Sequence, residues 1–228
     1  MKIYIVRHGD PDYKNDCLTE LGHLQAEAVA LRLKDEHFDK VYSSPFGRAR
    51  ETAGYIVKYH DGMDVELLQF MKEITWGPKG GVPTVGYNPW DVVGKRVAEG
   101  DKINNVDWTE NGPLSDNLVC DIINGIADAS DKWLEELGYT REGDYYRVCD
   151  VKYNDILIAC HGGSSFGLIS RLVNLPFSFM CGAFHLSMTG IIVIELSNEK
   201  GRLCSPVIKL FNDAQHINGI SVENKYEM

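Results

Sequence analysis

Short apolar segments alternate with longer helical segments along this chain, and this alternation restricts the fold more than any other feature. The expected strands lie at 3–6, 40–44, 65–68, 156–160, 189–196 and 203–211. The expected helices lie within 18–39, 45–60 and 118–137, with a further helix opened by Ser164 or Ser165. Strands that alternate with helices favour a three-layer α/β fold, in which a mostly parallel central sheet carries helices on both faces.

Capping signals predict where two of the helices begin. Thr19 can accept hydrogen bonds from the free backbone N–H groups of a first turn, and Pro45 suits the first turn of the following helix. Apolar residues recur at helical spacing behind Thr19, which predicts the buried face of that helix. The predicted face consists of Leu21, Leu24, Ala28 and Leu31.

The chain is long enough for one large domain, and we expect residues 1–228 to form a single α/β domain with an insertion. The insertion is 76–117, where glycine, proline and aromatic residues crowd the run WGPKGGVPTVGYNPW, and it is expected to form a lid. Its larger side chains either line a substrate site or form a small core under a long loop, with the cations solvated. These side chains are Trp76, Tyr87, Trp90, Trp108, Lys79, Lys95 and Arg96.

The charge and the cysteines exclude some classes of protein. A net charge of −10 disfavours nucleic acid and anionic membranes as partners, but it does not disfavour a small anionic substrate. Six cysteines without a C-x-x-C pair indicate reduced thiols, with neither a disulfide framework nor a zinc site. No apolar run reaches the roughly 20 residues that span a bilayer, so we expect a soluble cytoplasmic protein.

Two of the expected strands end on a histidine that is followed by glycine. The strand at 3–6 leads to His8, and the strand at 156–160 leads to His161 and Gly162. Ligands of open α/β sheets bind at the carboxyl ends of the strands. We therefore expect the two histidines in one pocket, although they are far apart in the sequence.

An anion is the expected ligand of this pocket. Arg7 and Arg48 each present a planar fork of N–H donors, which matches the oxygens of a phosphate group. The helix behind His161 adds free backbone N–H groups, and Gly162 allows the backbone to approach a ligand closely. Together these groups predict a phosphate site.

Five segments, taken in order, resemble a known family. VRHG, LTELGHLQA, SSPFGRARETA, EITWG and CHGG are similar to the motif series of the histidine phosphatase superfamily, which has the phosphoglycerate-mutase-like fold. The resemblance runs from the first strand to the helix after His161 and does not cover the segment 76–117. It implies a phosphomonoester hydrolase that acts on a small phosphorylated metabolite without a metal or other cofactor.

The resemblance also implies a role for each matched residue. His8 is the nucleophile and carries a phosphohistidine, while Arg7, Arg48 and His161 hold the phosphoryl oxygens and Gly162 contributes to substrate binding. A neutral imidazole suits the first of these roles because it attacks without prior deprotonation.

Glu73 matches the acid of the family, which protonates the leaving group and later assists the attack of water. Asp10, which is near His8 in the sequence, is the alternative acid. Asn15 is a further expected substrate-binding residue, although it lies one place beyond the asparagine position of the family, where this chain has Lys14.

Two departures from the family pattern favour a phosphatase over a mutase. Ile74 and Thr75 stand where mutases carry a pair of arginines, and the long stretch that mutases have between RHG and LT is missing. The alternatives are a phosphoglycerate-mutase-type phosphotransferase, a phospholigand-binding domain without turnover, and a metal-dependent phosphatase that uses His8 and Asp10.

Each candidate residue has a structural alternative. His8 and His161 can be hydrogen-bonded structural histidines, and Arg48 can be a solvated helix residue, but their shared position at strand ends favours function. His185 receives no role, and His216 is expected to be structural. The oligomeric state is not predicted.

Overall fold

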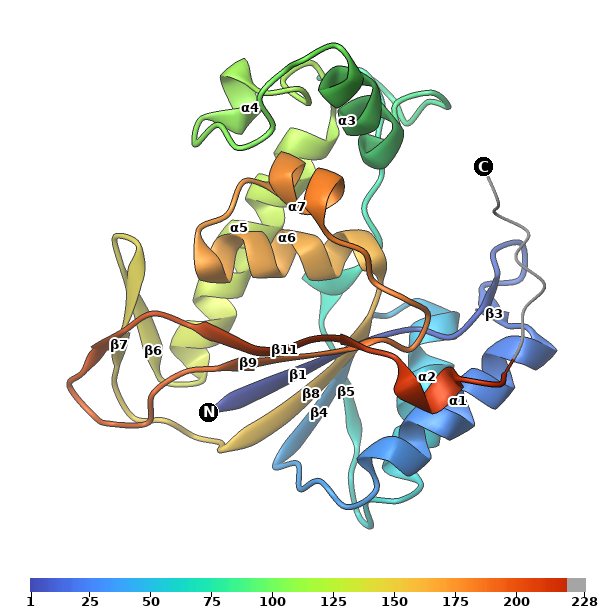
Figure 1. The fold of residues 1–228 in the computed structure, drawn as a ribbon. Helices are drawn as coiled ribbons and strands as arrows, with labels where there is room; N and C mark the ends of the chain where they lie inside the picture. Colours follow the sequence, from blue (N-terminus) through green and yellow to red (C-terminus); the bar gives the residue numbers. More distant parts are fainter. Residues whose placement is uncertain (221–228) are drawn as a thin grey trace.

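Six strands form a mixed central sheet in the computed structural model, which describes residues 1–220 (Figure 1). They are β1 (Lys2–Arg7), β4 (Lys40–Ser43), β5 (Val65–Leu67), β8 (Asp155–Cys160), β9 (Ile191–Glu195) and β11 (Val207–Asp213). The spatial order is β11-β9-β1-β8-β4-β5. The pairs from β1 to β5 are parallel, whereas β9 runs antiparallel to both β1 and β11. The predicted α/β fold with a mostly parallel sheet is confirmed.

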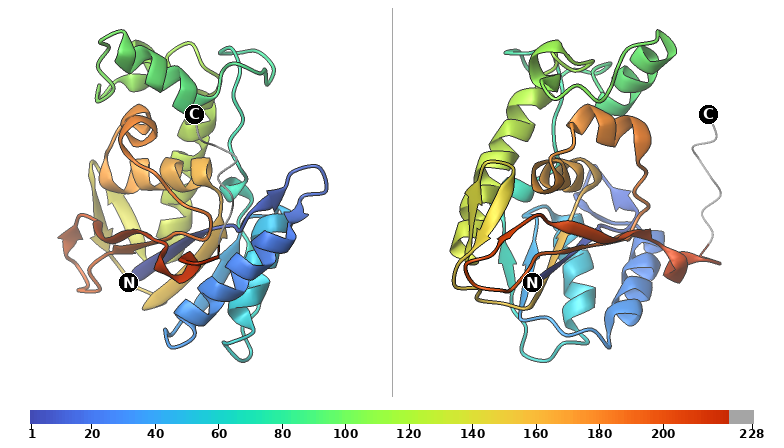
Figure 2. Two further views of the ribbon diagram at one scale, coloured as in Figure 1. Left: turned by 45° about the vertical axis from the view of Figure 1, so that its right-hand side comes forward. Right: turned by 60° about the vertical axis from the view of Figure 1, so that its left-hand side comes forward.

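Helices cover both faces of this sheet (Figure 2). The four long ones are α1 (Glu20–Leu33), α2 (Gly47–Val57), α5 (Val119–Glu136) and α6 (Gly162–Val173). Successive side chains of a strand point to opposite faces, so β1 contributes to two apolar layers. Ile5 packs in the layer that contains α5 and α6, and Val6 packs in the layer that contains α1 and α2.

The strand pairing brings three strand ends together. β8 lies between β1 and β4 and is parallel to both. The pairing continues one residue beyond the strands, because the His8 N–H donates to Cys160 O at 2.9 Å and the Ser44 N–H donates to Ala159 O at 2.8 Å. His8, Ser44 and His161 therefore leave the sheet side by side at one edge.

Two smaller sheets lie outside the central one. One contains β6 (Tyr139–Glu142), β7 (Tyr145–Val148) and β10 (Leu203–Cys204). The other contains β2 (Pro11–Asp12) and β3 (Cys17–Leu18). β6 and β7 pair as an antiparallel hairpin with a tyrosine on each arm. The strand expected at 203–211 is divided into β10 and β11 at Pro206, whose missing N–H cannot contribute to a strand ladder.

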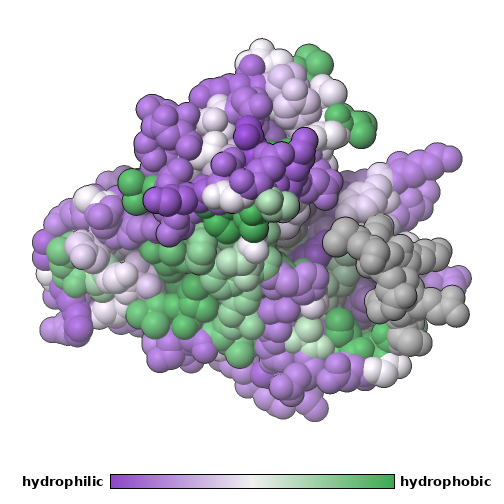
Figure 3. Space-filling view, turned by 45° about the horizontal axis from the view of Figure 1, so that its top comes forward, coloured by the Kyte–Doolittle hydropathy of each residue, from purple (hydrophilic) through white to green (hydrophobic). Residues whose placement is uncertain are grey.

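The segment 76–117 has regular structure of its own at the top of Figure 1. It contains α3 (Pro89–Ala98) and α4 (Trp108–Asn111), and α3 packs on α7 (Phe177–Ala183). Trp76, Trp90 and Trp108 pack on the main apolar core. The outer surface of the segment is mainly hydrophilic (Figure 3). Its cationic side chains Lys79, Lys95 and Arg96 are exposed. These tryptophans therefore pack in the interior, as in the second interpretation given above, although they join the main core and do not form a separate small one.

The predicted buried face of α1 is wrong. Leu24 and Leu31 are 61% and 48% exposed, whereas small residues such as Gly22, Ala26 and Ala30 face the interior. Small side chains allow α1 to lie close to its neighbours, and Gln25, Val29 and Leu33 complete the buried face. None of the helices within residues 1–220 is both long and apolar enough to cross a membrane.

Two predicted helix starts are also wrong. α2 begins at Gly47 and not at Pro45, because the carboxylate of Asp16 accepts the Gly47 N–H at 2.7 Å and caps the helix from another part of the chain. α6 begins at Gly162, before both of the serines that were expected to open it, and His161 is its N-cap residue. The helix N-terminus therefore lies closer to the sheet edge than predicted.

A close approach of two glycines joins the loop after β1 to the start of α1. A Cβ atom on Gly9 would lie 2.5 Å from the carbonyl oxygen of Gly22, and a Cβ atom on Gly22 would overlap the carbonyl oxygen of Asp10. Real Cβ atoms do not come this close to backbone, so only glycine fits at both positions.

We predict that Gly22→Ala lowers the free energy of unfolding by about 2–3 kcal/mol, because the backbone must move to admit the methyl group. Gly54→Ala is the matched control, since Gly54 is also inside a helix but nothing lies within 4 Å of a Cβ atom there. Removing a helical glycine should raise the stability of this control by about 0.5–1 kcal/mol. Urea unfolding measures both changes, and a Gly22→Ala protein as stable as the wild type would contradict the prediction.

Candidate active site

His8 lies at the end of β1 with 1% of its surface exposed. Its Nδ1 is 2.7 Å from the carbonyl oxygen of Gly9, and because a carbonyl only accepts, Nδ1 carries the ring proton. Nε2 therefore holds a lone pair, to which the Nε–H of Arg48 donates at 3.3 Å. Burial, together with the charges of Arg7 and Arg48, lowers the pKa of His8 to about 3, so the ring is neutral near pH 7.

His161 lies beside His8 at the end of β8. The two ring centroids are 5.0 Å apart in an edge-to-face arrangement. Nε2 of His161 is 2.7 Å from the hydroxyl oxygen of Ser44, whereas Nδ1 is buried without a hydrogen-bond partner among the described residues. Burial, and then the neighbouring His8 and arginine side chains, lowers the pKa of His161 to about 2.

Arg48 is held from three sides. Its Nη1 donates to Asp16 Oδ1 at 2.6 Å, and this is the same carboxylate that caps α2. Its guanidinium carbon lies 4.9 Å from the ring centroid of Phe46 and 5.4 Å from that of Tyr13. These contacts fix the direction of the guanidinium, which is what bidentate recognition of an anion requires.

Arg7 lies against the first turn of α6. Its Nη1 donates to the carbonyl oxygen of Leu186 at 2.5 Å, and its Nε is buried without a partner among the described residues. A Cβ atom on Gly162 would be 3.7 Å from this Nε, so the guanidinium lies beside the helix N-terminus. The positive charge of Arg7 therefore lies beside the start of α6, where the N–H groups of Gly163 and Ser164 are not free, as the sequence predicted, but donate to Glu73.

Glu73 closes the site from the segment after β5. Its Oε1 accepts three backbone N–H groups, from Ile74 at 2.9 Å, Gly163 at 3.1 Å and Ser164 at 3.2 Å. Burial nevertheless raises the pKa of Glu73, and this effect outweighs the opposing hydrogen bonds and the charge of Arg7. Because Oε1 is occupied by donors, a bound proton resides on Oε2.

Two buried nitrogens in this cluster, Arg7 Nε and His161 Nδ1, have no partner within residues 1–220. A buried polar atom without a partner costs about 1–3 kcal/mol, so such atoms in a native protein call for an explanation. An anion that accepts hydrogen bonds at this point would satisfy both. The arrangement can hold a phosphoryl group against the lone pair of His8.

The structure brings together five of the residues that the sequence singled out, namely Arg7, His8, Arg48, Glu73 and His161. It does not bring Asn15 to them. Asn15 is exposed, and its amide donates to Asp12 Oδ2 at 2.7 Å within a local turn. The expectation that Asn15 binds substrate has no support in this geometry.

Three other residues have different surroundings. The carboxylate of Asp10 accepts the Thr19 hydroxyl at 2.7 Å and so holds the start of α1. His185 is exposed. Nε2 of His216 lies 2.9 Å from Thr189 Oγ1, and the Thr189 N–H donates to the carbonyl oxygen of His8 at 3.3 Å, so His216 supports the backbone of the site.

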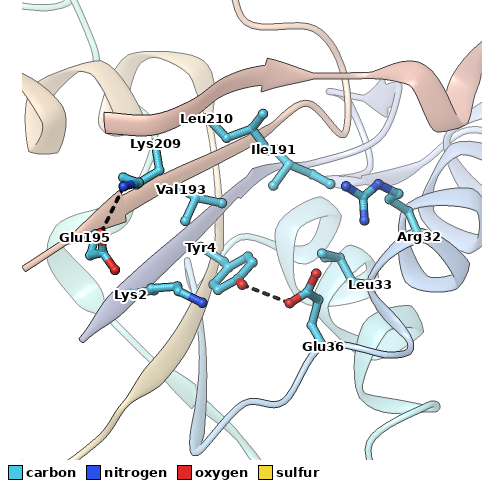
Figure 4. A pocket seen from close by; sticks show the side chains of 10 residues that line it. All are labelled: Lys2, Tyr4, Arg32, Leu33, Glu36, Ile191, Val193, Glu195, Lys209 and Leu210. Carbon is cyan, nitrogen blue, oxygen red and sulfur yellow. Dashed lines mark hydrogen bonds and ion pairs between the residues drawn. The ribbon is translucent and has the colours of Figure 1, made fainter. Parts of the chain in front are cut away.

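A separate hollow of about 230 Å³ lies between α1 and the strands β1, β9 and β11 (Figure 4). Its polar side chains already bind one another: the Tyr4 hydroxyl donates to Glu36 at 2.9 Å, and Lys209 lies 3.3 Å from Glu195. None of the candidate catalytic residues lines it. Across residues 1–220, no cluster of three or more His, Cys, Asp or Glu side chains is arranged to hold a metal ion.

The sequence is similar to a known protein family and to two named proteins. A model of the histidine phosphatase superfamily (branch 1) matches residues 3–86. A protein of Hydrogenobacter thermophilus named as a phosphoserine phosphatase is 24% identical over 213 residues, which are 89% of this chain and 93% of that protein. A protein of Photorhabdus laumondii named as a phosphoglycerate mutase is 33% identical over 86 residues, which are 34% of this chain and 40% of that protein.

A solved structure extends the similarity to almost the whole chain. The phosphoserine phosphatase of Entamoeba histolytica in complex with 3-phosphoglyceric acid superposes with a TM-score of 0.60 at 25% identity, and the match covers 95% of this chain and 98% of that one. Residues 3–86 thus match the histidine phosphatase superfamily, and the fold of almost the whole chain is similar to that of a phosphatase. The predicted phosphoglycerate-mutase-like fold and the enzyme class, a phosphatase of this superfamily, are confirmed.

Sequence reasoning missed two side chains of this histidine phosphatase site. Ser44 follows β4 directly, as His8 follows β1 and His161 follows β8, so the rule that found the histidines also applies to a third parallel strand. Asp16 has no comparable signal, because its pairing with Arg48 joins a loop to the first turn of α2, which is distant in the sequence.

We predict that the protein becomes less stable as the pH falls from 8 to 5. The unfolded chain binds protons at His8 and His161 below about pH 6.5, whereas the folded chain, with pKa values of about 3 and 2, does not. Each histidine should therefore lower the free energy of unfolding by about 2 kcal/mol at pH 5. Urea unfolding at several pH values measures this dependence.

His161→Asn should remove about half of this histidine contribution. His185→Asn, which changes an exposed histidine, is the control for the substitution itself. An unchanged pH dependence in His161→Asn would show that His161 is not held neutral by the fold.

Proposed function

We propose that this chain is a phosphomonoester hydrolase that works through a phosphohistidine on His8, requires no metal, and acts on a small phosphorylated metabolite. The observation that carries the proposal is the lone pair on Nε2 of His8, which faces a cluster of unpartnered and cationic donors. A nucleophile in such surroundings fits an electrophile that is also an anion, and a phosphomonoester is both.

In the first half of the reaction, Nε2 of His8 attacks phosphorus and the bond from phosphorus to the ester oxygen breaks. The Arg48 N–H that now donates to Nε2 turns to a phosphoryl oxygen, where Arg7 and His161 also donate. The Nδ1–H remains on Gly9 O and stabilises the positive charge that the phosphorylated ring acquires. Most of the catalysis in phosphoryl transfer is positioning and charge stabilisation of this kind.

The leaving oxygen receives the electron pair of the broken bond and needs a proton, which Oε2 of Glu73 supplies. The raised pKa of Glu73 allows the carboxyl to hold that proton at a pH where an ordinary glutamate would have lost it. In the second half, a water molecule attacks phosphorus and gives a proton to the Glu73 carboxylate. The bond from nitrogen to phosphorus breaks, and its electron pair returns to Nε2.

The relatives indicate the size of the substrate. The Entamoeba histolytica phosphoserine phosphatase has been solved with 3-phosphoglyceric acid and, as a mutant, with phosphoserine, both of which are small phosphorylated metabolites. The segment 76–117 is proposed to border the part of the site that receives the alcohol. Hydrolysis of a panel of phosphoesters, with and without chelator, tests both the substrate class and the independence from metal.

The second candidate function is a phosphoglycerate-mutase-type transferase, which the similarity to the Photorhabdus protein favours. Ile74, which stands in place of an arginine of the mutases, is buried in the apolar core and offers no second anion contact. Release of inorganic phosphate should therefore outpace isomerisation of a phosphoglycerate, and the opposite order would favour the mutase. Tight phosphate binding without hydrolysis of any ester would indicate a binding domain.

We predict that His8→Ala abolishes the phosphoenzyme. Protein incubated with a ³²P-labelled phosphoester and quenched should retain acid-labile label in the wild type and none in His8→Ala, because no other imidazole lone pair faces the donors. His185→Ala, in which an exposed histidine is changed, should be labelled like the wild type. Turnover by His8→Ala within a few-fold of the wild type would reject the mechanism.

We predict that Glu73→Gln lowers kcat by about 10²–10⁴-fold for an alkyl phosphate, because the leaving alkoxide then receives no proton. The loss should be much smaller for p-nitrophenyl phosphate, whose phenolate leaves without protonation. Steady-state kinetics with both substrates gives the comparison. An equal loss for both would mean that Glu73 only shapes the site.

A further inference from the structure

Ser44 has an unusual set of neighbours for a buried hydroxyl group. The Phe46 N–H donates to Ser44 Oγ at 3.3 Å, and Nε2 of His161 lies 2.7 Å from the same oxygen. No other hydrogen bond of this oxygen occurs among the described residues, and Ser44 is completely buried. Because no other acceptor lies within hydrogen-bond distance of Oγ among the described residues, the hydroxyl proton finds its acceptor at Nε2 of His161.

The direction of this hydrogen bond decides which nitrogen of His161 carries the proton. A neutral imidazole has one N–H, so a ring that accepts at Nε2 has its proton on Nδ1. Nδ1 is the buried nitrogen without a partner in the site. We propose that Ser44 is a positioning residue that holds His161 in the Nδ1–H tautomer, so that Nδ1–H donates to the phosphoryl group of the substrate.

The opposite tautomer would place a lone pair toward the phosphoryl oxygens and repel them. Within residues 1–220, no carboxylate contacts His161 to fix the tautomer by charge; its ring neighbours are His8 and Phe46, with centroids at 5.0 and 5.4 Å. Because the pKa of His161 is low, the ring is neutral near pH 7 and carries a proton on only one of its two nitrogens. The Ser44 hydroxyl is therefore the group that lets a neutral His161 donate a hydrogen bond to an anion.

The inference deepens the proposed function, but its first test needs no turnover. ¹⁵N NMR of histidine-labelled wild-type protein without substrate distinguishes a protonated from an unprotonated nitrogen in each ring. The expected result is a protonated Nδ1 and an unprotonated Nε2 in His161. A protonated Nε2 would overturn the assignment of Ser44, whether or not His8 forms a phosphohistidine, so the two failures are distinguishable.

Three variants test the consequence for catalysis. Ser44→Ala should shift His161 toward the Nε2–H tautomer and lower kcat by about 100-fold, with a smaller change in KM, because a donor to the transition state is lost. Ser44→Thr keeps the hydroxyl and should recover most of the activity. Ser43→Ala is the matched control: Ser43 is the adjacent buried serine, and its hydroxyl donates only to the carbonyl oxygen of Ser44 at 2.8 Å.

Each alternative outcome contradicts the proposal. An Nδ1–H tautomer that persists in Ser44→Ala, a kcat loss of the same size in Ser43→Ala, or a Ser44→Thr protein as impaired as Ser44→Ala would each mean that Ser44 only packs. Should Ser44→Ala fail to fold, the wild-type spectrum together with the activity of Ser44→Thr still decides.

Discussion

The parallel pairing of β8 with β1 on one side and β4 on the other is the constraint on which the site depends. Each of these strands delivers one side chain to the same edge of the sheet, and the backbone hydrogen bonds of His8 and Ser44 to the end of β8 keep the three in register. A slip of one residue in either pair would turn the side chain to the other face. The distance between the two imidazoles is thus a property of the sheet and not of a flexible loop.

Burial acts in opposite directions on the two kinds of titratable group in the site. It lowers the pKa of His8 and His161, because their charged form is cationic, and it raises the pKa of Glu73, because its charged form is anionic. One dry environment therefore favours a neutral nucleophile and a protonated acid at the same pH. The charges of the two arginines strengthen the first effect and oppose the second.

The parts of the molecule that sequence reasoning predicted correctly depend on local patterns. The apolar strands, the Thr19 cap and the two histidines at strand ends are of this kind. The errors arise where contacts with distant residues decide. The face that α1 buries includes Gly22, Ala26 and Ala30, which carry little hydrophobic signal, and α2 is capped by Asp16 from a distant loop. The substrate-binding role of Asn15 stays a prediction from the resemblance, and its amide donates to Asp12 within a local turn.

The sequence by itself determined which strands exist and which reactive side chains follow them. Both can be predicted locally, because the residues that form a strand and the residue that follows it are neighbours in the sequence. Only the tertiary structure decided what each reactive group binds. The hydrogen bond between Ser44 and His161, the ion pair between Asp16 and Arg48, and the two N–H groups of α6 that donate to Glu73 all join separate segments. Such contacts form when the sheet closes the distance between the segments, and no local pattern encodes their direction.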